Sequence, residues 1–233
     1  MKLLRAGACL ALALPATSVL AEVRQAAPDG FFLAFTQSTT VSPARAYAAV
    51  AALPRWWSDE HTWSGKAANL SLKAEAGGCF CERWADGSAE HGRVLMAIPG
   101  KLLRLETALG PLQEFALTGV LTFWVRYNED GTARIDVEYR VNGSSASALD
   151  QWAPQVDDML GAQFARFVRY IGTGDPEDHA KSGAADGDTP RGAAARAAVL
   201  EEWKQQIERD AAARKATAPV SPVAAHPAAG GKP

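Results

Sequence analysis

The sequence predicts an α+β domain in which a curved antiparallel sheet wraps around a long C-terminal helix and leaves an internal cavity. Three observations support this fold class. A strand pattern over residues 30–41 and a helix pattern over residues 42–53 come first. A run of short apolar strand patterns separated by turn residues follows. A long amphipathic helix pattern over residues 147–171 comes last, and a curved sheet gripping such a helix often leaves unfilled space.

The first helix has clear boundary signals. Ser42 is a suitable N-cap, and Pro43 fits the first helical position because proline has no N–H to leave unpaired there. Pro54 is expected to end the helix. Residues 55–66 are then predicted to form a helical turn and a tryptophan-rich loop.

The remaining strands are predicted to form an antiparallel meander. The last one alternates Ile135, Val137, Tyr139 and Val141 with charged residues, which is typical of a sheet with one buried face. The final helix is expected to open with a capping box at residues 147–150 and to end at Gly172. The predicted strands of the meander cover residues 69–76, 79–84, 91–98, 102–109, 114–127 and 132–141.

The two ends of the chain differ in composition from the middle. Lys2 and Arg5 precede an apolar run that ends in Val19-Leu20-Ala21, as in a secretory signal peptide. The run is shorter than the roughly 20 residues of a spanning helix, so we expect cleavage, export to the periplasm and no membrane span in the mature chain. The predicted organisation is a signal peptide (1–21), a linker (22–29), the domain (30–174), a flexible linker (175–188), a helix (189–216) and a disordered Pro/Ala-rich tail (217–233).

Composition and motifs exclude several classes of function. A formal net charge of −2 gives no electrostatic attraction to nucleic acid, so no nucleic-acid partner is expected. The sequence has no phosphate-binding glycine loop, no complete metal-ligand spacing and no nucleophile elbow. We therefore predict no cofactor and no metal ion.

Two cysteines, Cys79 and Cys81, remain after removal of the signal peptide. On a regular strand this spacing puts both on one face, with Cα atoms near or beyond the limit of a relaxed disulfide. Two free thiols, a strained disulfide and metal ligation are the alternatives. The pair cannot complete a zinc site alone, and His61 and His91 lie in different predicted elements.

Glu82 and His91 are the candidate catalytic residues. If Phe80 and Trp84 face the core, the strand period of two turns Glu82 to the core as well, where a carboxylate must be paired, protonated or in contact with water. His91 could work beside it as an acid or base near neutral pH. The alternative is structural: a surface salt bridge for Glu82 and a solvent or packing role for His91.

Several stretches, together with the order of elements, resemble a known superfamily. They are Trp56-Trp57, Trp63-Ser64-Gly65, residues 77–84, 90–94, 99–105 and 109–113, and the closing helix. Residues 30–174 are similar to SRPBCC (START-like) domains, and especially to the branch named for activators of a heat-shock-protein ATPase. The resemblance implies a helix-grip fold whose cavity holds a hydrophobic or amphipathic molecule. Export argues against activation of a cytosolic chaperone.

The favoured hypothesis is an exported, non-enzymatic protein that binds a hydrophobic or aromatic small molecule, including lipid-like ones. A cyclase- or dehydratase-like acid–base enzyme in the same cavity is one alternative. A protein-interaction module acting through helix 189–216, which contains Trp203, is another. Core packing is an equal interpretation of the tryptophans. The predicted ligand contacts are Trp56, Trp57, His61, Trp63, Phe80, Glu82, Trp84, Phe123, Tyr139 and Met159.

Overall fold

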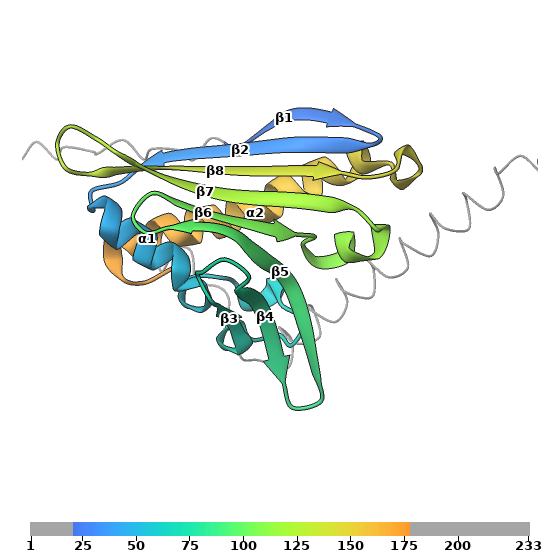
Figure 1. Ribbon diagram of the computed structural model, residues 1–233, viewed down its shortest axis with the longest axis horizontal. Helices are drawn as coiled ribbons and strands as arrows, with labels where there is room; N and C mark the ends of the chain where they lie inside the picture. Colours follow the sequence, from blue (N-terminus) through green and yellow to red (C-terminus); the bar gives the residue numbers. More distant parts are fainter. Residues whose placement is uncertain (1–20, 178–233) are drawn as a thin grey trace, which may run out of the picture. The chain divides into compact units, whose positions relative to one another are not determined.

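A computed structural model describes residues 21–177, which form the domain in Figure 1. Residues 1–20 of the predicted signal peptide (1–21), residues 178–188 of the predicted linker, the predicted helix 189–216 and the predicted tail 217–233 lie outside the described residues.

The sheet has eight strands, each antiparallel to its neighbours, in the order β1-β2-β8-β7-β6-β5-β4-β3. The chain enters at one edge, crosses to β3 at the other, and returns strand by strand to pair β8 with β2 (Figure 1). This arrangement confirms the predicted meander. The strands are β1 (Ala21–Ala27), β2 (Gly30–Ser38), β3 (Leu70–Leu72), β4 (Cys79–Trp84), β5 (Gly87–Ile98), β6 (Leu102–Thr107), β7 (Thr118–Tyr127) and β8 (Ala133–Asn142).

Two α-helices pack against the sheet, α1 (Pro43–Ala51) and α2 (Leu149–Thr173). Ser42 caps α1 through its side chain, and Pro43 occupies the first turn, as expected. Phe164 of α2 meets Phe35 of β2 at 5.9 Å between ring centres. The α+β fold with a long C-terminal helix gripped by an antiparallel sheet is therefore confirmed. Short 3-10 turns connect the main elements: η1 (Leu53–Arg55), η2 (Asp59–His61), η3 (Ala67–Asn69), η4 (Gly110–Phe115) and η5 (Ser145–Ser147).

The core lies between the inner face of the sheet and the two helices. On β8, Ile135, Val137, Tyr139 and Val141 are buried, whereas the charged residues between them lie on the outer face. The residues of α2 that are buried against this face are Leu149, Trp152, Ala153, Val156, Leu160, Gln163, Phe164, Phe167 and Ile171.

The expected ligand-sized space between sheet and helix is where the prediction differs most from the structure. At its centre lies a cavity of about 10 Å³, bounded by aromatic rings such as Trp57, Phe123 and Phe164. This volume suits about one water molecule, whereas small-molecule sites measure roughly 300–1,000 Å³. Trp56 and Trp57 turn inward and fill the space that the fold alone would leave open.

Several local boundaries also differ from expectation, including the strand predicted over residues 69–76, which covers only Leu70–Leu72, and the strand predicted from residue 91, which starts at Gly87. Residues 22–29, expected to be a linker, supply most of β1, which is held by backbone pairing with β2 rather than by an apolar pattern. The strand predicted from residue 114 starts at Thr118, because η4 occupies the preceding residues. α2 has no side-chain cap at its N-terminus, where Ala148 adopts a left-handed conformation instead of the expected capping box.

Within residues 21–177 no helix has both the length and the apolar character needed to cross a bilayer.

Candidate functional site

The candidate site is built around residues 56–64, here called the tryptophan segment. Trp56 is almost fully buried and packs against Phe167 of α2 and Phe123 of β7, with its indole N–H donating to the carbonyl of Ala49 at 2.8 Å. Trp57 is also buried and lies edge-on to Phe80 of β4. The first half of the segment therefore forms part of the core.

Gln163 of α2 holds the middle of the tryptophan segment. Its side chain is buried, and Oε1 accepts the backbone N–H of Ser58 at 2.8 Å. This contact fixes the orientation of the amide, so Nε2 donates to Nδ1 of His61 at 2.7 Å. Nδ1 of His61 must then carry no proton, because a proton there would point at the amide N–H of Gln163.

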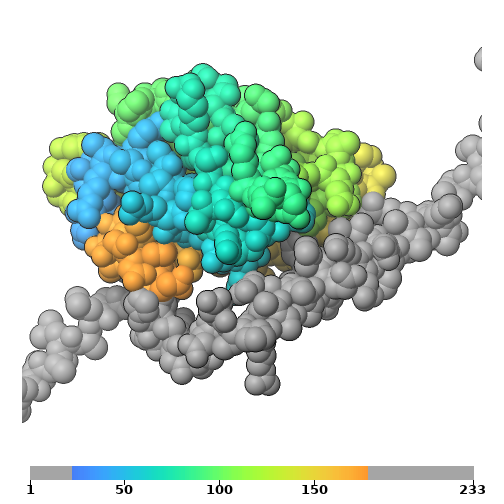
Figure 2. All heavy atoms as spheres, turned by 90° about the horizontal axis from the view of Figure 1, so that it is seen from below, coloured from blue at the N-terminus to red at the C-terminus, as the bar shows by residue number. Residues whose placement is uncertain are grey.

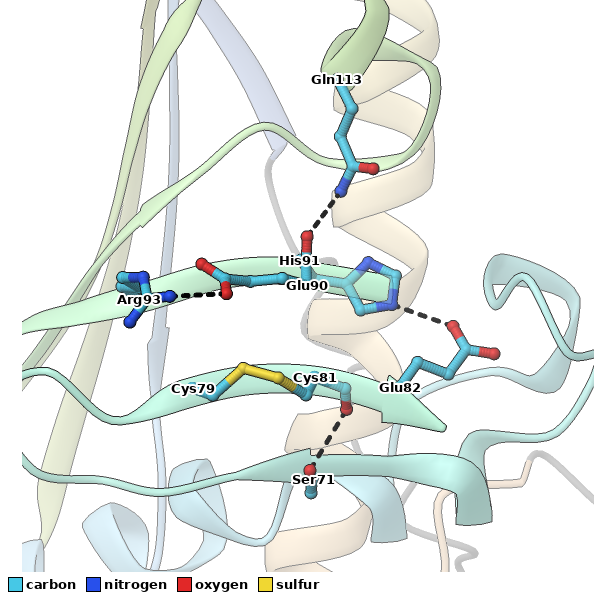
Figure 3. The surroundings of a disulfide bond; sticks show 8 residues. All are labelled: Ser71, Cys79, Cys81, Glu82, Glu90, His91, Arg93 and Gln113. Carbon is cyan, nitrogen blue, oxygen red and sulfur yellow. Dashed lines mark hydrogen bonds and ion pairs between the residues drawn. A yellow bond between two sulfur atoms is a disulfide. The ribbon is translucent and has the colours of Figure 1, made fainter. Parts of the chain in front are cut away.

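Glu82 of β4 holds the end of the tryptophan segment. Its carboxylate, which is fully buried, accepts the backbone N–H groups of Trp63 at 3.0 Å and Ser64 at 2.5 Å. It also lies 2.9 Å from Nε2 of His91 on β5 (Figure 3). The expectation that Glu82 faces inward and is paired agrees with this geometry, and its partners are not the surface arginines of the alternative.

A β-bulge sets the position of His91. Phe80 pairs with Gly92 and Cys81 with Glu90, so His91 is an extra residue on β5. The carbonyl of His91 accepts from the hydroxyl of Thr107 on β6. A side chain at Gly92 would bring a Cβ within 2.4 Å of the carbonyl oxygen of Glu106, so only glycine permits this close approach. The bulge turns the His91 ring inward, onto Phe80 at 4.9 Å between ring centres.

Electrostatics favour ionised Glu82 and neutral His61. Burial alone would raise the pKa of the Glu82 carboxyl, but hydrogen bonds from Ser64, Trp63 and His91 outweigh it and lower the pKa. Burial of part of the ring lowers the pKa of His61; Glu60 acts to raise it and Arg166 to lower it further. The ionised carboxylate of Glu82 accepts a hydrogen bond from Nε2–H of His91. In this tautomer Nδ1 is the ring nitrogen without a proton.

Cys79 and Cys81 form a disulfide on β4, beside the bulge (Figure 3). Their Cα atoms are 5.5 Å apart, within the usual range for disulfides and shorter than the roughly 6.6 Å of a regular strand. Of the three alternatives, the structure has the disulfide, and the Cα atoms lie close enough for it. Among residues 21–177 no cluster of three potential metal-ligating side chains occurs.

The structure gathers most of the predicted contact residues but not all. The interior between sheet and helix contains or adjoins Trp56, Trp57, Phe80, Glu82 and Phe123. His61 is hydrogen-bonded to Gln163, and His91 is hydrogen-bonded to Glu82.

Four predicted contacts lie apart from this interior or on its margin. Tyr139 is a core residue whose hydroxyl accepts from Leu109 and donates to the carbonyl of Thr107. The ring of Trp84, at the end of β4, lies against Gly87 at the start of β5. Trp63 is 39% exposed, and Met159 is half-buried.

Gln163 belongs to the candidate site but is not among the ligand contacts predicted from the sequence. Its position on the buried face of the last helix was predictable from periodicity, but its partners Ser58 and His61 are more than a hundred residues away. A glutamine on an otherwise apolar helix face was the available signal, since a buried amide requires hydrogen-bond partners.

Comparisons with known proteins give distant likenesses to solved structures. No family model and no curated protein matches this chain. A conserved protein of unknown function from Enterococcus faecalis is similar in structure, with a TM-score of 0.45 and 10% identity over 80% of this chain and 91% of its own.

Two further solved structures show likenesses of similar size. A protein from Arthrobacter aurescens has a TM-score of 0.46 and 12% identity over 70% of this chain and 96% of its own. A protein from Mesorhizobium loti has a TM-score of 0.40 and 20% identity over 60% of this chain and 95% of its own. Identities of this size transfer no function from one protein to another.

Proposed function

We propose that this is an exported, periplasmic SRPBCC-like protein that binds an apolar or aromatic small molecule between its sheet and α2. The observation that carries the proposal is how the tryptophan segment closes the interior. It is held at Ser58 and His61 by Gln163, and at Trp63 and Ser64 by Glu82. Movement of the segment would take the Trp57 ring out of the interior and open an apolar space.

The interior has the chemistry of an apolar site. The small cavity is surrounded by aromatic and aliphatic side chains, with Gln163 as the one polar side chain on its wall. Ligand sites of soluble proteins combine such walls with a few placed polar groups. An aromatic ligand would replace the contacts that the Trp57 ring makes with Phe80 and Trp56.

The proposed ligand is tested by isolating the protein from the periplasm of its own host and recording native and denaturing mass spectra. The expected result is a bound small molecule in the native spectrum that is lost on denaturation, and a mature N-terminus at Glu22. A chain that keeps residues 1–21 would contradict export. Ligand-free protein from several growth conditions, which also fails to bind apolar probes, would contradict the binding proposal.

A second candidate, an acid–base enzyme of cyclase or dehydratase type, is favoured by the Glu82–His91 pair. A carboxylate that holds Nε2–H leaves Nδ1 to take a proton from a substrate, as in other carboxylate–histidine pairs. A ligand would then have to reach Nδ1. The test is the ¹⁵N shift of the His91 ring on ligand binding: a shift specific to Nδ1 supports the enzyme, and unchanged ring signals contradict it.

A further inference from the structure

A second pocket lies between α1 and the end of α2, away from the interior. Its volume is about 320 Å³, and it shares no lining residue with the small internal cavity. Figure 2 shows the α1 region, in blue, beside the end of α2, in orange. The lining residues are Arg45, Ala48 and Ala49 of α1, Arg55 of η1, Tyr170 and Ile171 of α2, and Gly174.

The two arginines of this pocket differ from the other arginines nearby. Arg166 pairs with Glu177 and also donates to the carbonyl of Trp56, and Arg169 donates to the carbonyl of Pro176. Arg45 and Arg55 are exposed, and within residues 21–177 neither guanidinium has a hydrogen bond or an ion pair. Both remain available to an incoming anion.

The remaining surface of the pocket is apolar or aromatic. Ala49 and Ile171 are largely buried and contribute aliphatic carbon, and Tyr170 contributes a half-buried ring. The C-terminal carbonyls of α2 near Gly174 carry a partial negative charge of about one half, which is smaller than the two full charges of Arg45 and Arg55. The pocket is therefore suited to a molecule with an anionic head and a short apolar body.

We propose that this pocket binds a small aliphatic anion, of which a medium-chain fatty carboxylate is the simplest member. At roughly 30 Å³ per small group, the volume accommodates about ten non-hydrogen atoms, the size of octanoate. The carboxylate pairs with the guanidinium groups, because arginine favours bidentate pairing with carboxylates. The chain lies against Ala48, Ala49 and Ile171.

The test is a titration of the full mature chain with octanoate, followed by methyl NMR of Ala48, Ala49 and Ile171. The expected result is saturable shifts at these methyl groups, with acetate and octanol each binding at least about tenfold more weakly. Arg45→Gln and Arg55→Gln should each weaken octanoate binding about five- to tenfold with unchanged melting temperature. Arg83→Gln, an exposed arginine on β4, is the matched control and should have no effect.

The proposal is overturned if octanoate leaves these methyl groups unshifted, or if octanol and the Gln variants bind as well as octanoate and wild type do. Shifts confined to Val137 and Leu160 would also overturn it, since those residues line the internal cavity and would report the site under the tryptophan segment. The two proposals can therefore fail separately.

Discussion

The carboxylate of Glu82 lies 2.9 Å from the imidazole Nε2 of His91, and the same carboxylate accepts the backbone N–H groups of Trp63 and Ser64. One buried charge thus joins β4, the bulge in β5 and the end of the tryptophan segment. Gln163 does the same for the middle of that segment from the opposite wall. These two attachments hold the middle and the end of the tryptophan segment, and Trp56 at its start is held by Ala49 and by Arg166 of α2.

Replacing Glu82 tests the first attachment. Glu82→Gln removes the charge and puts an amide N–H group where donors converge, so buried N–H groups lose their acceptor. We expect a loss of about 2–4 kcal/mol in the free energy of unfolding, measured by urea denaturation. Glu106→Gln, on the exposed face of β6, should change it by less than about 0.5 kcal/mol. Equal effects of the two substitutions would contradict the role of Glu82.

Replacing Gln163 tests the second attachment. Gln163→Leu keeps the volume but leaves the backbone N–H of Ser58 without its acceptor. Amides of residues 56–64 should then exchange with deuterium at least about tenfold faster, whereas those of β8 keep their protection. Gln151→Leu, an exposed site on the same helix, is the control. Unchanged exchange in the segment of the Gln163 variant would show that the amide does not hold it.

His61 makes the second attachment sensitive to pH. Its pKa in the folded protein lies below the unfolded value of 6.5, so the unfolded chain takes up the proton first as the pH falls. The contribution of neutral His61 to stability is complete above that value and is lost below it.

The matching variant is His61→Asn, which can accept from Gln163 without titrating. Wild type should lose more unfolding free energy than this variant between about pH 7.5 and about pH 5.5. Parallel pH profiles from urea denaturation would exclude His61 as the cause.

The sequence was informative where local pattern decides structure. Alternation on β8 and the Ser42-Pro43 start of α1 were readable because each depends on neighbouring residues. β1 was missed because it lacks an apolar alternation and is held by pairing with β2 and by packing against α2. Core packing was one of two equal interpretations of the tryptophans, and the sequence could not decide between them, since the inward turn of Trp57 depends on partners in β4 and α2.

The bulge at His91 was also beyond sequence reasoning, and it sets the position of His91 beside Glu82. The disulfide encloses only Phe80, so it restricts the unfolded chain little. Reduction, or the Cys79→Ser/Cys81→Ser double variant, should lower the free energy of unfolding by about 1–2 kcal/mol. Mass spectrometry after alkylation should show both cysteines unmodified before reduction and both alkylated after it. Free thiols in protein purified without reductant would contradict the bond.

The most direct measurement is a titration of residues 22–233 with N-phenylnaphthylamine, an uncharged aromatic probe, followed by methyl NMR of Val137 and Leu160 beside the internal cavity. Saturable shifts at both residues, together with faster amide exchange in residues 56–64, are expected if a ligand enters as the tryptophan segment opens. Trp57→Leu should tighten binding by vacating the site, whereas Trp84→Leu should not. Binding that leaves Val137 and Leu160 unshifted, or no saturable binding in wild type and Trp57→Leu alike, would contradict an interior ligand site.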